Sequence, residues 1–117
     1  GEAPYTLFLP NDEAFAKLSE EELQWLRSEE GRPDLIMLLR QHMVPGTVVQ
    51  KDLEGALTDG GGKVELANLA GTTLGFRRQA STIQIGEDAS GPLISLPPQV
   101  ADNGVIYEIS ALIQPDS

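Results

Sequence analysis

The sequence has 117 residues, of which 40% are hydrophobic, and it carries a formal net charge of -10 at pH 7 with no cysteine. This length indicates one domain that buries roughly two-thirds of its unfolded surface on folding. The charge disfavours nucleic acid and other polyanions as partners, and the lack of cysteine excludes disulfides, thiolate catalysis and cysteine-ligated zinc. No apolar run approaches the roughly 20 residues that span a bilayer, so we expect a soluble domain without membrane insertion.

The N-terminal residues predict a strand that leads into a helix. The apolar run at 5–9 has the composition of a strand, and Pro10 should end it. Asn11 is a preferred N-cap residue, and two acidic residues follow it at the positive end of the expected helix dipole. We therefore expect a helix from residue 12, with Phe15 and Leu18 facing the core.

A second helix is predicted immediately after Ser19. Ser19 and Glu22 have the spacing of a capping box, in which each residue satisfies a free backbone N–H of the other. Leu23 and Leu26 would then form the apolar face of the helix. We expect Trp25 to lie at the edge of that face.

A third helix is predicted from residue 33 onward. Pro33 suits the first turn of a helix, where its missing N–H has no cost. The residues that then recur at helical spacing are Leu35, Leu38, Leu39 and His42. We expect Pro45-Gly46 to end this helix.

Beyond Gly46 the apolar period shortens from about 3.6 to 2, which predicts short antiparallel strands packed on the helices. The positions that mark these strands are Val48, Val49, Leu57, Val64, Leu66, Leu74, Phe76, Ile83, Ile85, Ile94 and Leu96. We expect a hairpin connection at 59–62 and a longer polar loop at 86–92. The run at 105–113 should be a strand covered on both faces, and Pro115 should end it. The predicted class is α+β.

His42 is the only histidine, so a catalytic or metal site built on imidazole must use it. One histidine cannot build a site with several histidine ligands, and no serine lies in the Gly-x-Ser-x-Gly pattern of a nucleophile elbow. We therefore favour a structural role, in which His42 ends a helix and hydrogen-bonds to the backbone.

Three other features could suggest a functional site, but each has a simpler structural explanation. Residues 60–63 read Gly-Gly-Gly-Lys but lack the spacing of a phosphate-binding loop, and we expect a flexible turn. The acidic clusters at 20–22, 29–30 and 87–88 lack the alternating spacing of a calcium loop, so solvated faces are the default. Arg77-Arg78 is the only adjacent basic pair and is expected at the edge of the sheet, where it would discourage aggregation.

Three ordered blocks resemble a fasciclin domain: residues 6–15, residues 38–46 and residues 103–109. The resemblance implies a single domain over 1–117, folded as a β-sandwich or wedge of short, mainly antiparallel strands with flanking N-terminal helices. It also implies an extracellular module for cell adhesion or matrix binding, without catalysis, metal or cofactor. A receptor of the stabilin type or a matrix adhesion protein would be a suitable parent.

The middle block carries the expected binding site for a protein partner, such as a cell-surface receptor or a matrix protein. The residues of this site are Gln41, His42, Met43, Val44, Val48 and Val49. Members of the family commonly have Tyr-His where this chain has Gln41-His42, and Asp-Ile where it has Pro98-Gln99, and both pairs are linked with integrin binding. Integrin recognition by that route is therefore not expected. Tyr107 replaces a common histidine and should change the fold little.

The resemblance also implies helical sequence before the opening strand, and we expect 1–117 to lack those first helices. An apolar surface would then be uncovered, and a second copy could mask it by dimerising or by exchanging an element. Two alternatives to an adhesion module stay open. One is a passive spacer domain in a scavenger receptor, and the other is a small metal-dependent hydrolase that uses the acidic clusters.

Overall fold

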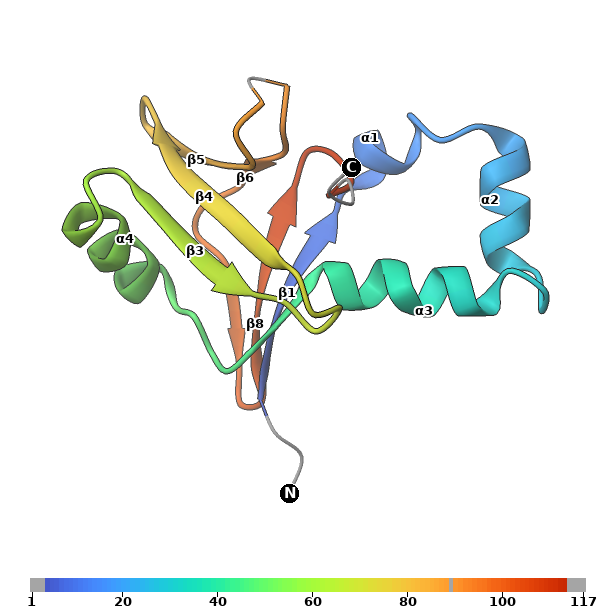
Figure 1. The fold of residues 1–117 in the computed structure, drawn as a ribbon, viewed down its shortest axis with the longest axis horizontal. Coiled ribbons are helices and arrows are strands. Elements are labelled where there is room, and N and C mark those ends of the chain that lie inside the picture. The colour runs from blue at the N-terminus through green and yellow to red at the C-terminus, as the bar shows by residue number, and fades with distance from the viewer. Residues whose placement is uncertain (1–3, 89, 114–117) are drawn as a thin grey trace.

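The computed structural model describes residues 4–88 and 90–113 (Figure 1). The strands of this part are β1 (Tyr5–Pro10), β2 (Met43–Pro45), β3 (Lys63–Ala67), β4 (Thr73–Gln79), β5 (Thr82–Ile85), β6 (Leu93–Ile94), β7 (Gln99–Ala101) and β8 (Gly104–Ile109). The helices are α1 (Asp12–Phe15), α2 (Glu20–Arg27), α3 (Arg32–Gln41) and α4 (Gln50–Asp59). The strands form a wedge-shaped sheet with helices beside it, so the α+β class is confirmed.

The sheet brings the two ends of the described chain together. Its strand order is β2-β1-β8-β6-β5-β4-β3, and β7 pairs with β8 outside this path. β1 and β8 are parallel and pair along their full length, from Tyr5 opposite Gly104 to Pro10 opposite Ile109, whereas the other pairs are antiparallel. A Cβ on Gly104 would lie 2.7 Å from the Tyr5 carbonyl oxygen, so this close parallel pairing requires glycine.

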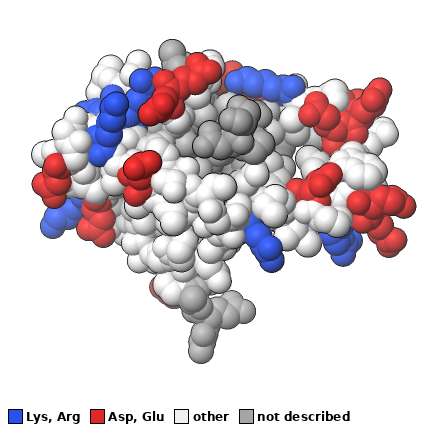
Figure 2. Space-filling view, viewed as in Figure 1, with Lys and Arg blue, Asp and Glu red and all other residues white. Residues whose placement is uncertain are grey.

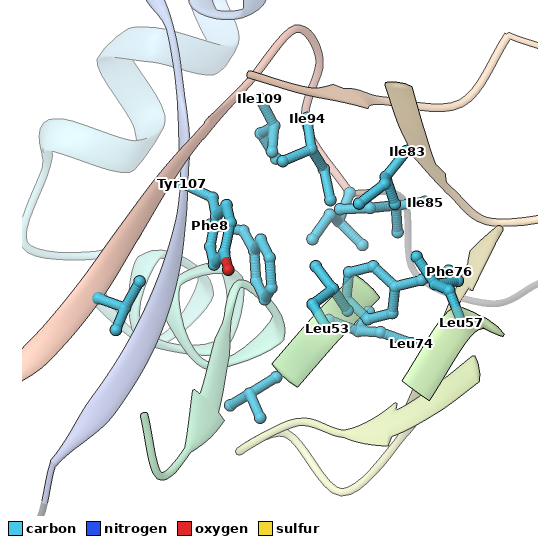
Figure 3. Packing of buried hydrophobic residues seen from close by; sticks show 13 residues of the cluster. Phe8, Leu53, Leu57, Leu74, Phe76, Ile83, Ile85, Ile94, Tyr107 and Ile109 are labelled. Carbon is cyan, nitrogen blue, oxygen red and sulfur yellow. The ribbon is translucent and has the colours of Figure 1, made fainter. Parts of the chain in front are cut away.

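Three aromatic rings from three strands form the centre of the core (Figure 3). The ring of Phe8 lies 5.2 Å from that of Phe76 and 5.5 Å from that of Tyr107, centroid to centroid, and all three side chains are fully buried. Leu53 and Leu57 of α4 point into the same cluster. The first and last strands therefore contribute to one hydrophobic nucleus, through Phe8 on β1 and Tyr107 on β8.

The capping signals before residue 23 are confirmed. The side chain of Asn11 accepts a hydrogen bond from Ala14 N at 2.9 Å and caps α1. Ser19 and Glu22 form the reciprocal capping box of α2, with bonds of 3.0 and 3.1 Å, and these bonds lower the pKa of Glu22. The prediction that Phe15 faces the core is wrong. Its side chain is 36% exposed and points to the far side of β1 from the core.

Helix α4 was not predicted, because Val48, Val49 and Leu57 were assigned to strands. The structure instead has a helix at Gln50–Asp59, and residues 60–62 join this helix to β3 rather than joining two strands. Only Leu53 and Leu57, four residues apart, are buried on it, and its N-cap Val49 makes no side-chain cap bond. A short apolar stripe without a polar cap gave little local evidence for a helix.

Helix α3 and strand β8 also differ from the bounds predicted from the sequence. Helix α3 ends at Gln41 and not at Pro45-Gly46, because Met43–Pro45 pairs with β1 as strand β2. β8 ends at Ile109, and only one of its faces is fully covered, since Ile106 is half-buried and Glu108 is exposed on the other. Pro115, which was expected to end that run, lies outside the described residues.

Helices α2 and α3 form an arm, residues 20–41, that extends away from the sheet (Figure 1). No side chain of either helix is buried, and the exposed fractions of Trp25 and Leu39 are 47% and 48%. The corner between the helices is held by a hydrogen bond of 2.7 Å from Trp25 Nε1 to Asp34 Oδ2. It also requires Gly31, because a Cβ there would collide with the carbonyl of Trp25.

Candidate functional site

The predicted binding segment, residues 41–49, runs from the end of α3 through β2 to the start of α4. Its backbone is fixed by hydrogen bonds to strand β1 and to the β3–β4 connection: Phe8 N donates to His42 O at 2.8 Å, and Leu69 N donates to Met43 O at 2.9 Å. Gly46 N donates to Pro4 O at 3.0 Å. These contacts come from segments far apart in the sequence. The segment is therefore a rigid part of the fold and not a free loop.

His42 lies inside the protein, where its two ring nitrogens bind backbone groups. Nδ1 lies 2.7 Å from Leu38 O, and Ile113 N lies 2.9 Å from Nε2. Because a carbonyl only accepts and an amide N–H only donates, the neutral ring carries its hydrogen on Nδ1. Burial lowers the pKa of His42 and outweighs the opposing effect of the bond to Leu38. The predicted structural role of His42 agrees with this geometry.

Two buried hydroxyl groups fix the far end of the segment. Thr6 Oγ1 donates to Gly46 O at 2.7 Å and accepts from Val48 N at 2.8 Å. Tyr107 donates its hydroxyl hydrogen to Val48 O at 2.7 Å. Burial, with a smaller contribution from the charges of Asp52 and Glu54, raises the pKa of Tyr107 to about 12. The backbone of Val48 is thus held from both sides by side chains of β1 and β8.

Asn68 supports the segment from the β3–β4 connection. It is 7% exposed, donates to Gln41 O at 3.3 Å and to Thr72 Oγ1 at 2.9 Å, and accepts from the backbone N–H of Ala70 and Thr72. The contact of Asn68 with this segment was not predicted from the sequence, and neither was the role of Thr6. Thr6 and the Asn68–Gln41 bond join groups that only the fold brings close, and no local pattern marks such pairs.

The six predicted site residues divide into two groups. His42 and Val44 are buried, and their side chains are not available to a partner. The partly exposed side chains of the segment are those of Gln41, Met43, Val48 and Val49. Any contact with a partner at this segment must therefore use the second group, while the first group holds the backbone in place.

A larger hollow lies beside the segment, between β1 and the arm. This apolar groove has a volume of about 690 Å³. Its walls are formed by Leu7 and Leu9 of β1, Phe15, Leu23 and Leu26 of α1 and α2, Leu35, Leu38 and Leu39 of α3, and Leu112. Arg27 and Arg32 also line it. His42 is also among the residues that line it.

A second hollow, of about 590 Å³, lies on the other side of the arm. It is lined by apolar side chains, including Trp25 and Met37, and by the carboxylates of Glu21, Glu22 and Asp34. Figure 2 shows acidic side chains gathered at the end of the molecule where α2 lies. The two sides of the arm therefore differ in charge, with arginine on the groove side and carboxylates on the other.

The remaining features of the sequence lie away from this region. β4 is an inner strand between β3 and β5, so the prediction that Arg77-Arg78 lies at the sheet edge is wrong. Arg77 Nη2 donates to Gln84 Oε1 at 2.8 Å. Among residues 4–88 and 90–113, no three side chains of His, Asp or Glu lie close enough to hold a metal ion. Within the same ranges, no helix is long and apolar enough to cross a membrane.

Comparison with known proteins identifies a family for nearly the whole chain. The family model described as "Fasciclin domain" matches residues 1–115. The chain is 30% identical over 114 residues to protein sll1483 of Synechocystis sp., and it covers 57% of that protein. It is 29% identical over 115 residues to human stabilin-1, of which it covers 4%. It is 31% identical over 118 residues to transforming growth factor-beta-induced protein ig-h3 of Sus scrofa, of which it covers 15%.

A solved structure shows the same fold. The FAS1 domain pair from the insect cell adhesion molecule fasciclin I superposes with a TM-score of 0.67 at 14% sequence identity. The match covers 94% of this chain and 36% of that one. The chain thus spans only part of each of these proteins, about half of the Synechocystis protein and far less of the other two relatives.

Proposed function

Because the chain belongs to the fasciclin domain family, we propose that it is an extracellular adhesion module that binds a protein partner and performs no catalysis. The proposal is supported by the solved structure of this fold, which comes from a cell adhesion molecule. The relatives in sequence include stabilin-1 and ig-h3. A relative from Synechocystis is equally similar. The names of these relatives therefore do not identify a partner, and we infer its chemical character from the surface of this chain.

The observation that carries the proposal is the fixed backbone of residues 41–49. A surface that is already rigid loses little conformational entropy on binding, so its contacts contribute more fully to affinity. The side chains that would contact the partner are those of Gln41, Met43, Val48 and Val49, beside the hydroxyl of exposed Thr47. A surface of this mixed character suits another protein better than a polyanion, which the net charge of -10 repels.

The chemistry of His42 favours binding over hydrolysis. A general base must have a free nitrogen within reach of its substrate, and both nitrogens of the only histidine bind backbone groups inside the protein. A hydrolase would have to work with carboxylates alone. The passive spacer is the remaining alternative, and it differs from the proposal in predicting no partner at all.

A cell-attachment assay on the purified domain tests the proposal. Surface-immobilised protein should retain cells, and Met43→Glu combined with Gln41→Ala should reduce attachment at unchanged thermal stability. Leu93→Glu, at an exposed position of β6, is the matched control and should attach cells as the parent does. The assay is repeated with chelator to detect a requirement for divalent cations. Equal attachment by the parent, the double variant and a surface without protein would contradict the proposal.

A further inference from the structure

Asn103, at the exposed tip of the β7–β8 hairpin, is held less tightly than the other two asparagines of the chain. Asn11 caps α1 through its Oδ1, and Asn68 is buried with both its side-chain oxygen and its side-chain nitrogen hydrogen-bonded. The side chain of Asn103 makes no hydrogen bond to any residue in 4–88 or 90–113. The next residue is Gly104, which has no side chain to hinder an approach to its backbone nitrogen. Of the three side-chain amides, that of Asn103 is therefore best able to reach the nitrogen that follows it.

The turn that carries Asn103 is not one of the favoured kinds. Asp102 and Asn103 form a two-residue loop between Ala101 of β7 and Gly104 of β8, which are paired. Two-residue loops that match the twist of the flanking strands need a positive φ at one or both central residues. Among the described residues other than glycine, only Ala80 has a positive φ, so neither loop residue meets this need. The tip of the hairpin is therefore poorly matched to its strands and should open easily.

We propose that Asn103 is a site of spontaneous deamidation, which converts it to isoaspartate and aspartate. The backbone nitrogen of Gly104 attacks Cγ of Asn103, a C–N bond closes a cyclic imide, and the side-chain nitrogen leaves as ammonia with the proton of the attacking N–H. Water then opens the ring. Cleavage of the new Cγ–N bond gives aspartate, and cleavage at the original peptide carbonyl gives isoaspartate. The reaction consumes one water, releases one ammonia and needs no further reactant.

The isoaspartyl product changes the start of β8. Its backbone runs through Cβ and Cγ of residue 103, so the main chain gains one carbon atom before Gly104. The carbonyl of Asn103, which accepts from Tyr5 N at 3.4 Å, becomes part of a free carboxylate. Gly104 has no room to move toward β1, since even a Cβ there would lie 2.7 Å from Tyr5 O. The extra atom must therefore open the pairing of Tyr5 with Gly104, whereas the aspartyl product keeps the normal backbone.

Peptide mapping after incubation of the intact chain tests the proposal. Trypsin cuts after lysine and arginine, so it places Asn11, Asn68 and Asn103 on three separate peptides, the last of which is 79–117. After incubation at mildly alkaline pH and body temperature, peptide 79–117 should gain the mass of exchanging NH₂ for OH, with isoaspartate as the main product. The other two peptides should stay unchanged. Asn103→Gln, whose longer side chain must close a larger ring, should abolish the conversion.

Hydrogen exchange on the aged protein then separates the two products. The Tyr5 amide should lose protection in the aged parent but keep it in Asn103→Asp, which has the charge of the product and a normal backbone. The Phe8 amide, which donates to His42 O, should stay protected in both. A synthetic peptide of residues 99–107 is the reference for an unrestrained chain. If this peptide deamidates while Asn103 of the folded chain stays intact, or if all three asparagines react at the same rate, the proposal is wrong.

Discussion

The sheet and the arm differ in how their side chains are stabilised. Three of the six residues of β1 are buried, namely Thr6, Phe8 and Pro10, and the strand is hydrogen-bonded to β2 on one side and β8 on the other. The arm has 18 helical residues and no buried side chain among them. The comparison shows that the sheet holds the predicted binding segment firmly, while the adjacent helical pair has no buried side chain to hold it.

The largest expected effect is the difference in unfolding free energy between alanine substitutions at Phe8 and at Phe15. Phe8→Ala removes a ring that packs between Phe76 and Tyr107 and should lower the free energy of unfolding by about 3–5 kcal/mol. Phe15→Ala removes the same group from the groove rim and should cost no more than about 1 kcal/mol. Urea denaturation measures both. Similar losses for the two variants would break the distinction between the core of the sheet and the rim of the groove beside the arm.

The next effect concerns the buried hydroxyl of Thr6. Thr6→Val keeps the shape of the side chain but leaves Gly46 O and Val48 N without their partner, and it should cost about 1–3 kcal/mol. Thr47→Val, at an exposed position of the same segment, is the matched control and should be nearly neutral. If thermal melting shows no difference between the two variants, the binding segment is not held as described.

A smaller effect depends on pH. Burial lowers the folded-state pKa of His42 below the ordinary 6.5, so the unfolded chain binds more protons in this range and stability must rise with pH. Stability should therefore be full above 6.5 and fall as the pH drops toward the lower folded-state value. Each unit of pKa difference contributes about 1.4 kcal/mol. In His42→Gln this dependence should vanish, and denaturation of both proteins across the range from about pH 5 to about pH 7.5 measures it. A flat profile for the parent would contradict the buried neutral imidazole.

The smallest global effect should come from the corner of the arm. Gly31→Ala forces a Cβ against the Trp25 carbonyl, so α2 must move relative to α3. Trp25 is the only tryptophan, and its emission should shift while the denaturation midpoint of the sheet changes little. Gly55→Ala places a Cβ in open space on α4 and should stabilise the protein by up to about 1 kcal/mol. A collapse of the whole fold in Gly31→Ala would show that the arm is part of the core.

Local signals explain what could be predicted from the sequence. Asn11, Ser19 and Glu22 cap helices through neighbours three residues away, so their roles follow from spacing alone. The resemblance to the fasciclin family placed 6–15 and 103–109 in one fold, and the parallel pairing of β1 with β8 confirms it. The structural role of His42 was predicted, although its second partner, Ile113 N, was not.

What could not be predicted depends on contacts distant in the sequence. Thr6 binds groups about forty residues away, and Asn68 reaches Gln41 O across the fold. Phe15 follows a good N-cap and has the hydrophobicity of a core residue, yet only the position of β1 decides that it faces the groove. Helix α4 lacks a polar cap and buries only two leucines, so neighbouring valines suggested strands. The roles of Gln41, Met43, Val48 and Val49 in binding stay a prediction.

Hydrogen exchange at low micromolar concentration tests the central claim most directly, because it measures the sheet and the arm in one experiment. The Phe8 amide, which donates to His42 O, joins the sheet to the binding segment, and the Leu23 amide donates to Ser19 O within α2. The Phe8 amide should exchange only through global unfolding, while the Leu23 amide exchanges through local opening at a far smaller free energy. Equal protection of the two amides in the monomer would contradict the account.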